Sequence, residues 1–181
     1  MAAPATKTIT DLNGSWVVNS QISDSPEAIL KLQGVNWLMR KVVSMATLTL
    51  IVDQNVDDDT GYTHLNIENK SNNGMPGAME RRVLDETPVE LNHTLLGSIR
   101  GRSKYCTLAE LEEPWLREDW EDGTDKVMHF NTEHLDQQPV VTQQVSGFMT
   151  VDGVRRYARK VLVTKGEDQR VQARLLYDYL G

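Results

Sequence analysis

The sequence has little of several residue types that would point to particular classes of protein. It contains one cysteine, Cys106, which excludes an internal disulfide framework and a zinc site built from several cysteines. It has no apolar run near the ~20 residues that span a bilayer, and residues 1–10 lack the apolar core of a secretory signal. Basic residues are also few, because 19 Lys and Arg face 26 Asp and Glu, for a net charge of −7. We therefore expect a cytoplasmic protein whose main partner is neither nucleic acid nor a membrane.

The usual catalytic and metal-binding motifs are missing as well. The chain has no nucleophile elbow, no Walker loop and no G-x-G-x-x-G dinucleotide motif. The acidic stretch 53–59 lacks the glycine and the closing glutamate of a calcium loop, and residues 57–61 predict a hairpin turn instead. His129 and His134 are five residues apart on a predicted strand and point to opposite faces, so they cannot share a metal. The sequence predicts no metal and no cofactor.

What the chain does have is enough apolar content for one ordinary folded domain. Its 181 residues are 39% hydrophobic before 12 glycines are counted, which is usual for a globular domain. We expect a flexible arm over residues 1–10 and a single domain over residues 11–181.

The spacing of apolar residues predicts one helical region followed by strands. The helical region covers 26–44, and Gly34 inside it can divide it into two helices. A short helical insertion interrupted by Pro114 is predicted at 108–119. The predicted strands cover 47–52, 62–67, 78–84, 93–105, 126–135, 140–151, 154–164 and 170–179. The sequence thus predicts an all-β fold, a single antiparallel closed β-barrel of about nine or ten strands with a helical cap after strand 1.

Three short stretches resemble the lipocalins and fatty-acid-binding proteins of the calycin superfamily. Residues 11–16 hold the Gly-x-Trp that opens their first strand. Residues 32–42 resemble the helix-turn-helix of the fatty-acid-binding proteins, and residues 173–178 resemble their closing strand. The order of the stretches and their distances from the termini agree too. The resemblance implies a lipocalin-like barrel over the whole chain.

One departure from the fatty-acid-binding proteins concerns the charge of the ligand. That family clamps a carboxylate with Arg-x-Tyr on the last strand, with both side chains pointing inward. Here Arg174 and Tyr177 are three residues apart and face opposite sides, while Leu175 stands two residues before Tyr177. We therefore expect a pocket that selects shape rather than charge, which argues against an ordinary fatty-acid carrier.

The whole chain, and chiefly Leu-x-Gly-x-x-Trp-Leu-x-Arg-Lys at 32–41, is most similar to small fungal lipocalin-like proteins encoded beside natural-product genes. Some of these are hetero-Diels-Alderases that join a tropolone o-quinone methide to a humulene-type sesquiterpene, giving the meroterpenoids called tropolonic sesquiterpenes. The resemblance implies a pericyclase that needs no cofactor and takes small apolar substrates. The alternative is a non-catalytic intracellular carrier of an apolar terpenoid or polyketide. An acid–base isomerase is less favoured, because the inferred inner faces hold no carboxylate or histidine, and the sequence leaves a homodimer open.

Candidate site residues follow from alternation along the predicted strands. A cycloaddition needs a dry pocket that holds two partners together and a hydrogen-bond donor for the carbonyl oxygen. The predicted catalytic donors are Tyr105, placed near the barrel mouth, and Tyr177. The predicted substrate-binding residues are Trp37, Trp115, Trp120, Phe130, Tyr157, Leu95, Ile99 and Met128, with the three tryptophans covering the mouth. For each tyrosine a core position with a satisfied hydroxyl stays open as the alternative.

Overall fold

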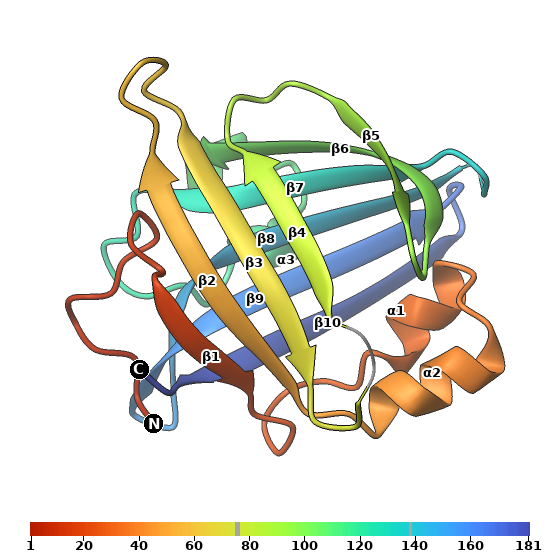
Figure 1. The fold of residues 1–181 in the computed structure, drawn as a ribbon, viewed down its shortest axis with the longest axis horizontal. Helices are drawn as coiled ribbons and strands as arrows, with labels where there is room; N and C mark the ends of the chain where they lie inside the picture. Colours follow the sequence, from red (N-terminus) through yellow and green to blue (C-terminus); the bar gives the residue numbers. More distant parts are fainter. Residues whose placement is uncertain (75–76, 138) are drawn as a thin grey trace.

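Ten antiparallel strands form one sheet that curls around an interior (Figure 1). A computed structural model describes residues 1–74, 77–137 and 139–181. The strands are β1 (Gly14–Val18), β2 (Leu48–Val56), β3 (Thr63–Ser71), β4 (Ala78–Val83), β5 (Val89–His93), β6 (Gly97–Cys106), β7 (Val127–His134), β8 (Val140–Val151), β9 (Val154–Lys165) and β10 (Gln169–Tyr179). Their order in the sheet is β4-β3-β2-β1-β10-β9-β8-β7-β6-β5, so strands that follow one another in the chain are neighbours in the sheet except β4 and β5, and β1 also pairs with β10.

The predicted all-β antiparallel architecture is confirmed, but hydrogen bonds do not close the barrel. β4 and β5 are the two edges of the sheet, and no ladder joins them within the described residues. Glu86 between them has a φ of 66°, and Pro88 comes directly before β5, so the chain leaves β4 in a turn instead of a hairpin. Side chains cross this seam, since the Arg82 guanidinium of β4 lies 4.7 Å from the ring centroid of Phe130 on β7.

The helical cap after the first strand is confirmed and consists of two helices, α1 (Glu27–Leu32) and α2 (Trp37–Ser44). Gly34 separates them with a φ of 80°, a conformation that glycine adopts without a Cβ clash. The side chain of Asn36 then caps α2 by accepting a hydrogen bond from the Met39 amide. Ile29 of α1 is buried in one cluster with Val161 of β9. The two helices lie at one end of the curled sheet, which we call the helical end (Figure 1).

Two predicted elements have different boundaries in the structure. The single strand predicted at 93–105 contains only the last residue of β5, then the turn 94–96 and β6, so Leu95 lies in a turn and not on a strand face. The predicted insertion at 108–119 consists of a 3-10 turn, η1 (Leu108–Glu110), and a short helix, α3 (Pro114–Arg117). Pro114 begins α3 instead of breaking it, because the fixed φ of proline suits a first turn. None of the helices in the described residues is long and apolar enough to cross a membrane.

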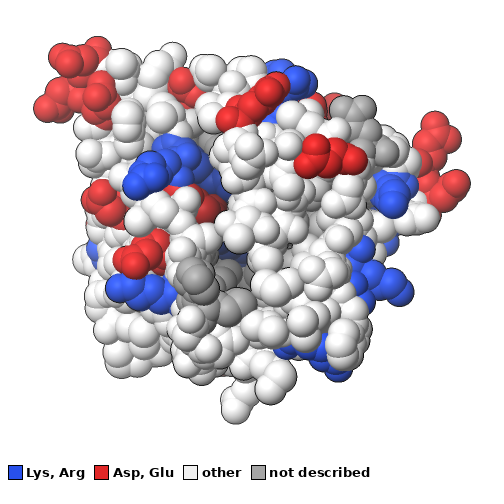
Figure 2. Space-filling view, turned by 45° about the vertical axis from the view of Figure 1, so that its right-hand side comes forward, with Lys and Arg blue, Asp and Glu red and all other residues white. Residues whose placement is uncertain are grey.

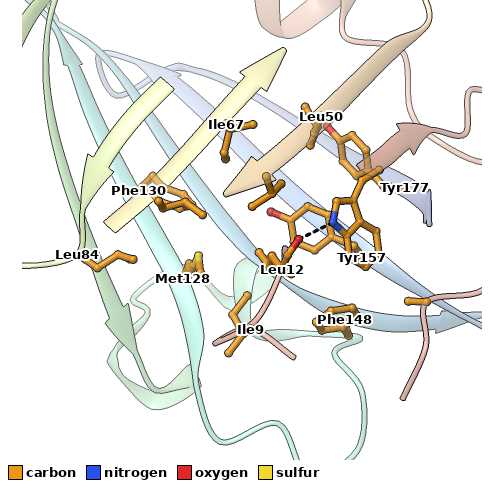
Figure 3. Close-up of a cluster of buried hydrophobic side chains, with 14 residues drawn as sticks. Ile9, Leu12, Leu50, Ile67, Leu84, Met128, Phe130, Phe148, Tyr157 and Tyr177 are labelled. Atoms are coloured by element: carbon orange, nitrogen blue, oxygen red, sulfur yellow. Dashed lines mark hydrogen bonds between the residues drawn. The ribbon is translucent and has the colours of Figure 1, made fainter. Parts of the chain in front are cut away.

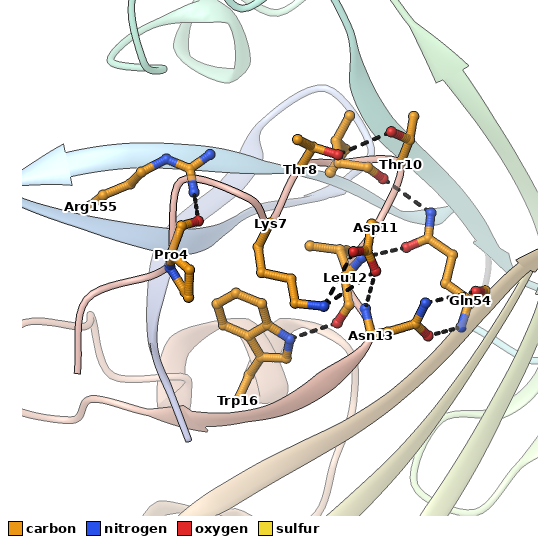
Figure 4. Close-up of polar contacts among 11 residues, drawn as sticks. Pro4, Lys7, Thr8, Thr10, Asp11, Leu12, Asn13, Trp16, Gln54 and Arg155 are labelled. Carbon is orange, nitrogen blue, oxygen red and sulfur yellow. Dashed lines mark hydrogen bonds and ion pairs between the residues drawn. The ribbon is translucent and has the colours of Figure 1, made fainter. Parts of the chain in front are cut away.

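Residues 1–13 cross the end of the sheet opposite the helices, which we call the closed end (Figure 4). Ile9 and Leu12 are buried, and the Trp16 indole N–H donates to the Leu12 carbonyl at 2.8 Å. Gln54 accepts from the Leu12 amide at 2.9 Å, and Arg155 donates to the Pro4 carbonyl at 2.8 Å. The segment that we expected to form a loose arm therefore packs against the barrel and seals this end.

The largest apolar cluster fills the closed half of the interior (Figure 3). The Trp16 ring lies 6.1 Å from the ring of Phe148, 5.4 Å from that of Tyr157 and 4.7 Å from that of Tyr179. Tilted aromatic contacts of this kind add to the stabilisation that comes from burying the rings. Trp16 therefore closes the floor of the barrel.

Candidate active site

The inner face of the sheet is packed in its closed half and accessible in the half nearer the helices. Along β7, Met128 is 0% exposed and Phe130 is 3% exposed, while Thr132, which also points inward, is partly exposed. Along β6, Ser103 is buried and Gly101, two residues nearer the helical end, is partly exposed. The face seen in Figure 2 is hollowed near its centre, with Lys or Arg side chains at the edge of the hollow. The inner face of the sheet is therefore open to solvent in the half nearer the helices.

Charged and hydroxyl side chains lie where the packed and accessible halves meet. We call this group the interior polar cluster: Asn69, Glu80, Arg82, Tyr157, Arg159 and Tyr177. The strand register places them together. Tyr157 and Arg159 alternate inward on β9 and pair with Tyr177 and Leu175 of β10. Glu80 on β4 pairs with the buried Ile67 of β3, so it also faces inward.

Glu80 and Arg82 form an ion pair on the inner face of the edge strand β4. Arg82 Nη2 lies 3.1 Å from Glu80 Oε2, and Asn69 donates to Glu80 Oε1 at 2.9 Å. The two side chains keep 23% and 25% of their surface accessible, as expected for groups that line an open interior. Burial alone would raise the pKa of Glu80, but Arg82, Arg159 and the Asn69 hydrogen bond outweigh it and lower the pKa to about 2. Glu80 is ionised at neutral pH, and both of its oxygens already accept hydrogen bonds.

Arg159 is the most deeply buried charge of the cluster, with 5% of its surface exposed. Its Nε donates to the Tyr157 hydroxyl at 3.2 Å, and its guanidinium lies 5.7 and 5.5 Å from the ring centroids of Tyr157 and Tyr177. Nη2 has no hydrogen-bond partner among the residues that the structure describes. Burial would lower the pKa of Arg159, but Tyr157, Tyr177 and Glu80 together raise it above its ordinary value. The guanidinium is therefore charged and has donor capacity to spare.

Tyr177 brings a phenol to the same place. Burial raises the pKa of Tyr177 to about 12, although the positive charge of Arg159 partly opposes the shift. The hydroxyl therefore keeps its proton at neutral pH and can donate. The Tyr157 oxygen accepts from Arg159, which leaves its own proton to donate elsewhere. The cluster thus presents hydrogen-bond donors of two kinds beside the apolar side chains of Phe130 and Leu175.

Comparison with known proteins now identifies the family. No family model matches the chain. The pericyclase pydY of Acremonium sp. is 36% identical over 183 residues, covering 100% of this chain and 98% of pydY. The probable pericyclase scpY of Mollisia scopiformis is 36% identical over 182 residues, covering 99% and 95% of the two chains. This chain belongs to the same pericyclase family. The predicted enzyme class is confirmed by these two relatives.

The fold of this pericyclase is that of the fatty-acid-binding proteins, as the sequence resemblance predicted. The solved structure of Echinococcus granulosus fatty-acid-binding protein 1 aligns with a TM-score of 0.56 over 94% of this chain and 98% of that chain. Sequence identity is 15%, so the likeness shows the fold alone. The departure on the last strand is also present in the structure, since Leu175 faces inward and pairs with Arg159.

Several of the predicted site residues lie in or beside the interior polar cluster. Tyr177 and Tyr157 belong to it, and Phe130 lies beneath the Arg82 guanidinium. Ile99 is buried on the inner face of β6, nearer the helical end. Met128 is also inward but lies deep in the packed closed half, below the accessible space.

Tyr105 faces inward, but the predicted place near the mouth is wrong. Its hydroxyl accepts from Gln54 Nε2 at 3.0 Å and donates to the Ile9 carbonyl at 3.4 Å, at the closed end. β6 runs away from the helices, so its last residues lie under the N-terminal segment and not beside the mouth. Burial raises the pKa of Tyr105. The geometry matches the alternative left open above, a core tyrosine with a satisfied hydroxyl.

The predicted placement over the mouth is wrong for Trp115 and Trp120. Trp115 and Trp120 pack against the outer face of the sheet, where Lys160 lies 5.0 and 5.5 Å from their ring centroids. The outer face of β8 to β10 is apolar there, so the insertion with α3 covers it instead of the mouth. Trp37 lies on α2 at the helical end with 63% of its surface exposed.

Sequence reasoning missed Arg159, Glu80 and Arg82. Alternation placed Tyr157 and Val161 on one inner face, and Arg159 lies between them on that same face. The statement that the inner faces hold no carboxylate or histidine is wrong, because Glu80 and the buried His134 both point inward. The expectation that the pocket selects shape rather than charge assumed that no arginine on the last strand points inward. The inward guanidinium of Arg159 on β9 supplies such a charge from another strand.

A separate recess of about 510 Å³ lies on the outer face of β6 to β8 beside η1. Acidic and basic side chains line it together, including Glu86, Lys104 and Glu133. Cys106 contributes to its wall, and burial raises the pKa of the thiol to about 11. The thiol is therefore protonated at neutral pH, as expected for an unreactive cysteine.

Proposed function

We propose that this pericyclase catalyses an intermolecular hetero-Diels-Alder cycloaddition between a tropolone o-quinone methide and a humulene-type sesquiterpene in fungal meroterpenoid biosynthesis. The observation that carries the proposal is the unpartnered Nη2 of Arg159, which lies with two tyrosine hydroxyls inside an otherwise largely apolar barrel. In such a reaction electrons flow from the alkene into the quinone methide, so the carbonyl oxygen gains negative charge. Donors fixed in advance at that oxygen stabilise the transition state more than the ground state.

Two groups of residues would have separate roles, hydrogen-bond donation and the positioning of the substrates. Arg159 and Tyr177 would donate to the carbonyl oxygen, and a donor of this kind is typically worth about 2.7–4 kcal/mol of barrier height. The apolar walls near Phe130, Val161 and Leu175 would hold the sesquiterpene against the diene. Holding two reactants in a reactive geometry contributes about 7–11 kcal/mol in favourable cases. The sealed closed end would limit the water that can add to the quinone methide.

The alternative is that the chain only carries an apolar terpenoid or polyketide. A carrier needs the same apolar walls, but it does not need a charged donor left without a partner deep in the interior. That unpartnered donor favours catalysis, because it becomes satisfied when an oxygen with developing charge lies beside it.

A turnover experiment tests the proposal. The protein is mixed with a quinone-methide precursor and humulene, and product formation and enantiomeric excess are compared with a protein-free sample. We expect faster product formation and one dominant stereoisomer, both lost in R159M. An unchanged rate with racemic product, together with saturable binding of the sesquiterpene, would establish the carrier.

A further inference from the structure

The interior polar cluster holds one more positive than negative charge. Arg82 and Glu80 neutralise each other through their ion pair, and the second carboxylate oxygen of Glu80 accepts from Asn69. Among the described residues, Arg159 is left with the Tyr157 hydroxyl as its hydrogen-bond acceptor. Nearer the helical end, burial lowers the pKa values of His93 and His134, so both imidazoles are neutral at neutral pH. The charge balance of the interior polar cluster is therefore +1, in a chain whose net charge is −7.

Lys160, the next residue in the chain, is a buried cation with a structural role and serves as a comparison for Arg159. Lys160 is 0% exposed and points to the outer face. Its Nζ donates to the carbonyls of Trp115 at 2.8 Å and Glu118 at 2.6 Å, and Asp119 lies 3.6 Å away. The ammonium is therefore surrounded by acceptors that belong to the chain itself.

Arg159 is nearly as buried and lacks such acceptors. A buried charge without a counterion is costly, and a guanidinium has five N–H groups to satisfy. Its Nη2 has no acceptor in the described part of the chain, although Glu80 is close enough to influence its charge. The Nη2 donor of Arg159 therefore gains a hydrogen-bond acceptor only when a ligand brings one into the interior.

We propose that Arg159 binds a formally negative oxygen of the substrate, so that the substrate carries, conjugated with its reacting carbonyl, an acidic group that is ionised at neutral pH. The chemical class is an ionised enol, phenol or carboxylate attached to the reacting π system. The inference deepens the proposed function and rests on it. A tropolone ring carries an acidic oxygen of this class, and the same guanidinium would bind that oxygen before and during the cycloaddition.

A pair of fluorescent probes that differ in charge tests the inference without turnover. Anilinonaphthalene sulfonate is an apolar anion, and phenylnaphthylamine is its neutral counterpart of nearly the same shape. We expect the wild-type protein to bind the anion about ten- to a hundredfold more tightly, as one charge-assisted hydrogen bond provides. R159M should lose this preference and keep its affinity for the neutral probe.

R174M is the matched control, because Arg174 lies on β10 between inward-facing Ala173 and Leu175 and so points to the outer face. It should keep the preference for the anion. If R159M does not fold, R159Q retains a donor without the charge and should also lose the preference. Equal affinities for the two probes in the wild-type protein, or a preference that survives in R159M or R159Q, would overturn the inference.

The binding experiment and the turnover experiment test different proposals, so one can be refuted without the other. Stereoselective turnover without a preference for the anionic probe would refute the ionised substrate and leave the pericyclase intact. A preference for the anion that depends on Arg159, without turnover, would instead refute the proposed reaction.

Discussion

Two tyrosines on the inner face, Tyr105 and Tyr177, have different surroundings, and removing one oxygen from each separates stability from catalysis. In Y105F the hydroxyl that bonds Gln54 and the Ile9 carbonyl disappears. Gln54 Nε2 keeps the Ile9 carbonyl as an acceptor at 3.2 Å, so no buried donor is left unpaired. The loss is then that of ordinary hydrogen bonds, about 1–2 kcal/mol of unfolding free energy. For a domain of this size that lowers Tm by about 2–8 °C.

Y177F should behave in the opposite way. Tyr177 keeps its proton, because burial raises its pKa to about 12, and it lies beside Arg159 where the packed and accessible halves of the interior meet. Losing a donor to an oxygen with developing charge costs about 1.5–3 kcal/mol of transition-state stabilisation. The rate should fall about ten- to a hundredfold. Tm should change little, because the ring and its packing remain.

The assay measures thermal unfolding and initial cycloaddition rate for both variants and for Y105F/Y177F. The two sites lie in separate parts of the interior, so their effects should add. A Y105F variant with normal Tm and a strongly reduced rate would refute the reasoning, since it would place Tyr105 at the substrate. A Y177F variant with full rate and stereoselectivity would remove Tyr177 from the site.

The remaining predictions concern stability and reactivity. G147A should lower the unfolding free energy in urea by about 1–3 kcal/mol, because a Cβ there would lie 2.9 Å from the Trp120 ring. The pKa of Glu80 is lowered from 4.5 to about 2, so its ionised form stabilises the fold above pH 4.5 and this contribution is lost as the pH falls towards 2. E80Q should therefore show a flatter dependence of unfolding free energy on pH in that window. The Cys106 thiol should resist iodoacetamide at neutral pH in the native protein and react once urea unfolds it, as peptide mapping would show.

Local pattern was sufficient to predict much of the sheet. The strand predicted at 140–151 has those bounds in the structure, and the Asp152-Gly153 turn connects it to β9. Two strands with alternating side chains and a tight turn between them can pair in few registers. The division of the helical region at Gly34 was predictable for a similar reason, since only a residue that tolerates positive φ fits there.

The edge strand β4 shows what local pattern could not give. Its apolar members Met79 and Val83 are exposed, while Glu80 and Arg82 face inward. A reading by hydrophobicity would reverse the two faces, because burying a charge is costly unless partners are present. The partners of Glu80 are Arg82, Asn69 on β3 and Arg159 on β9. Asn69 meets Glu80 when β3 pairs with β4, but Arg159 meets it only after the sheet has curled. The same holds for Trp115 and Trp120, whose place depends on an apolar outer face formed by distant strands.

Departures from simple burial rules are concentrated at the candidate site, and that concentration is itself informative. Proteins break such rules mainly where function requires it. On β9 the segment Tyr157-x-Arg159-x-Val161 sets a charge between two inward neutral residues, and alternation alone is enough to place that charge inside the barrel. An arginine in such a position needs an acceptor from the chain or from a ligand. Among the described residues, Tyr157 accepts from Nε and no group accepts from Nη2. The strand pattern, the burial and the proposed reaction therefore all indicate that Arg159 binds the substrate.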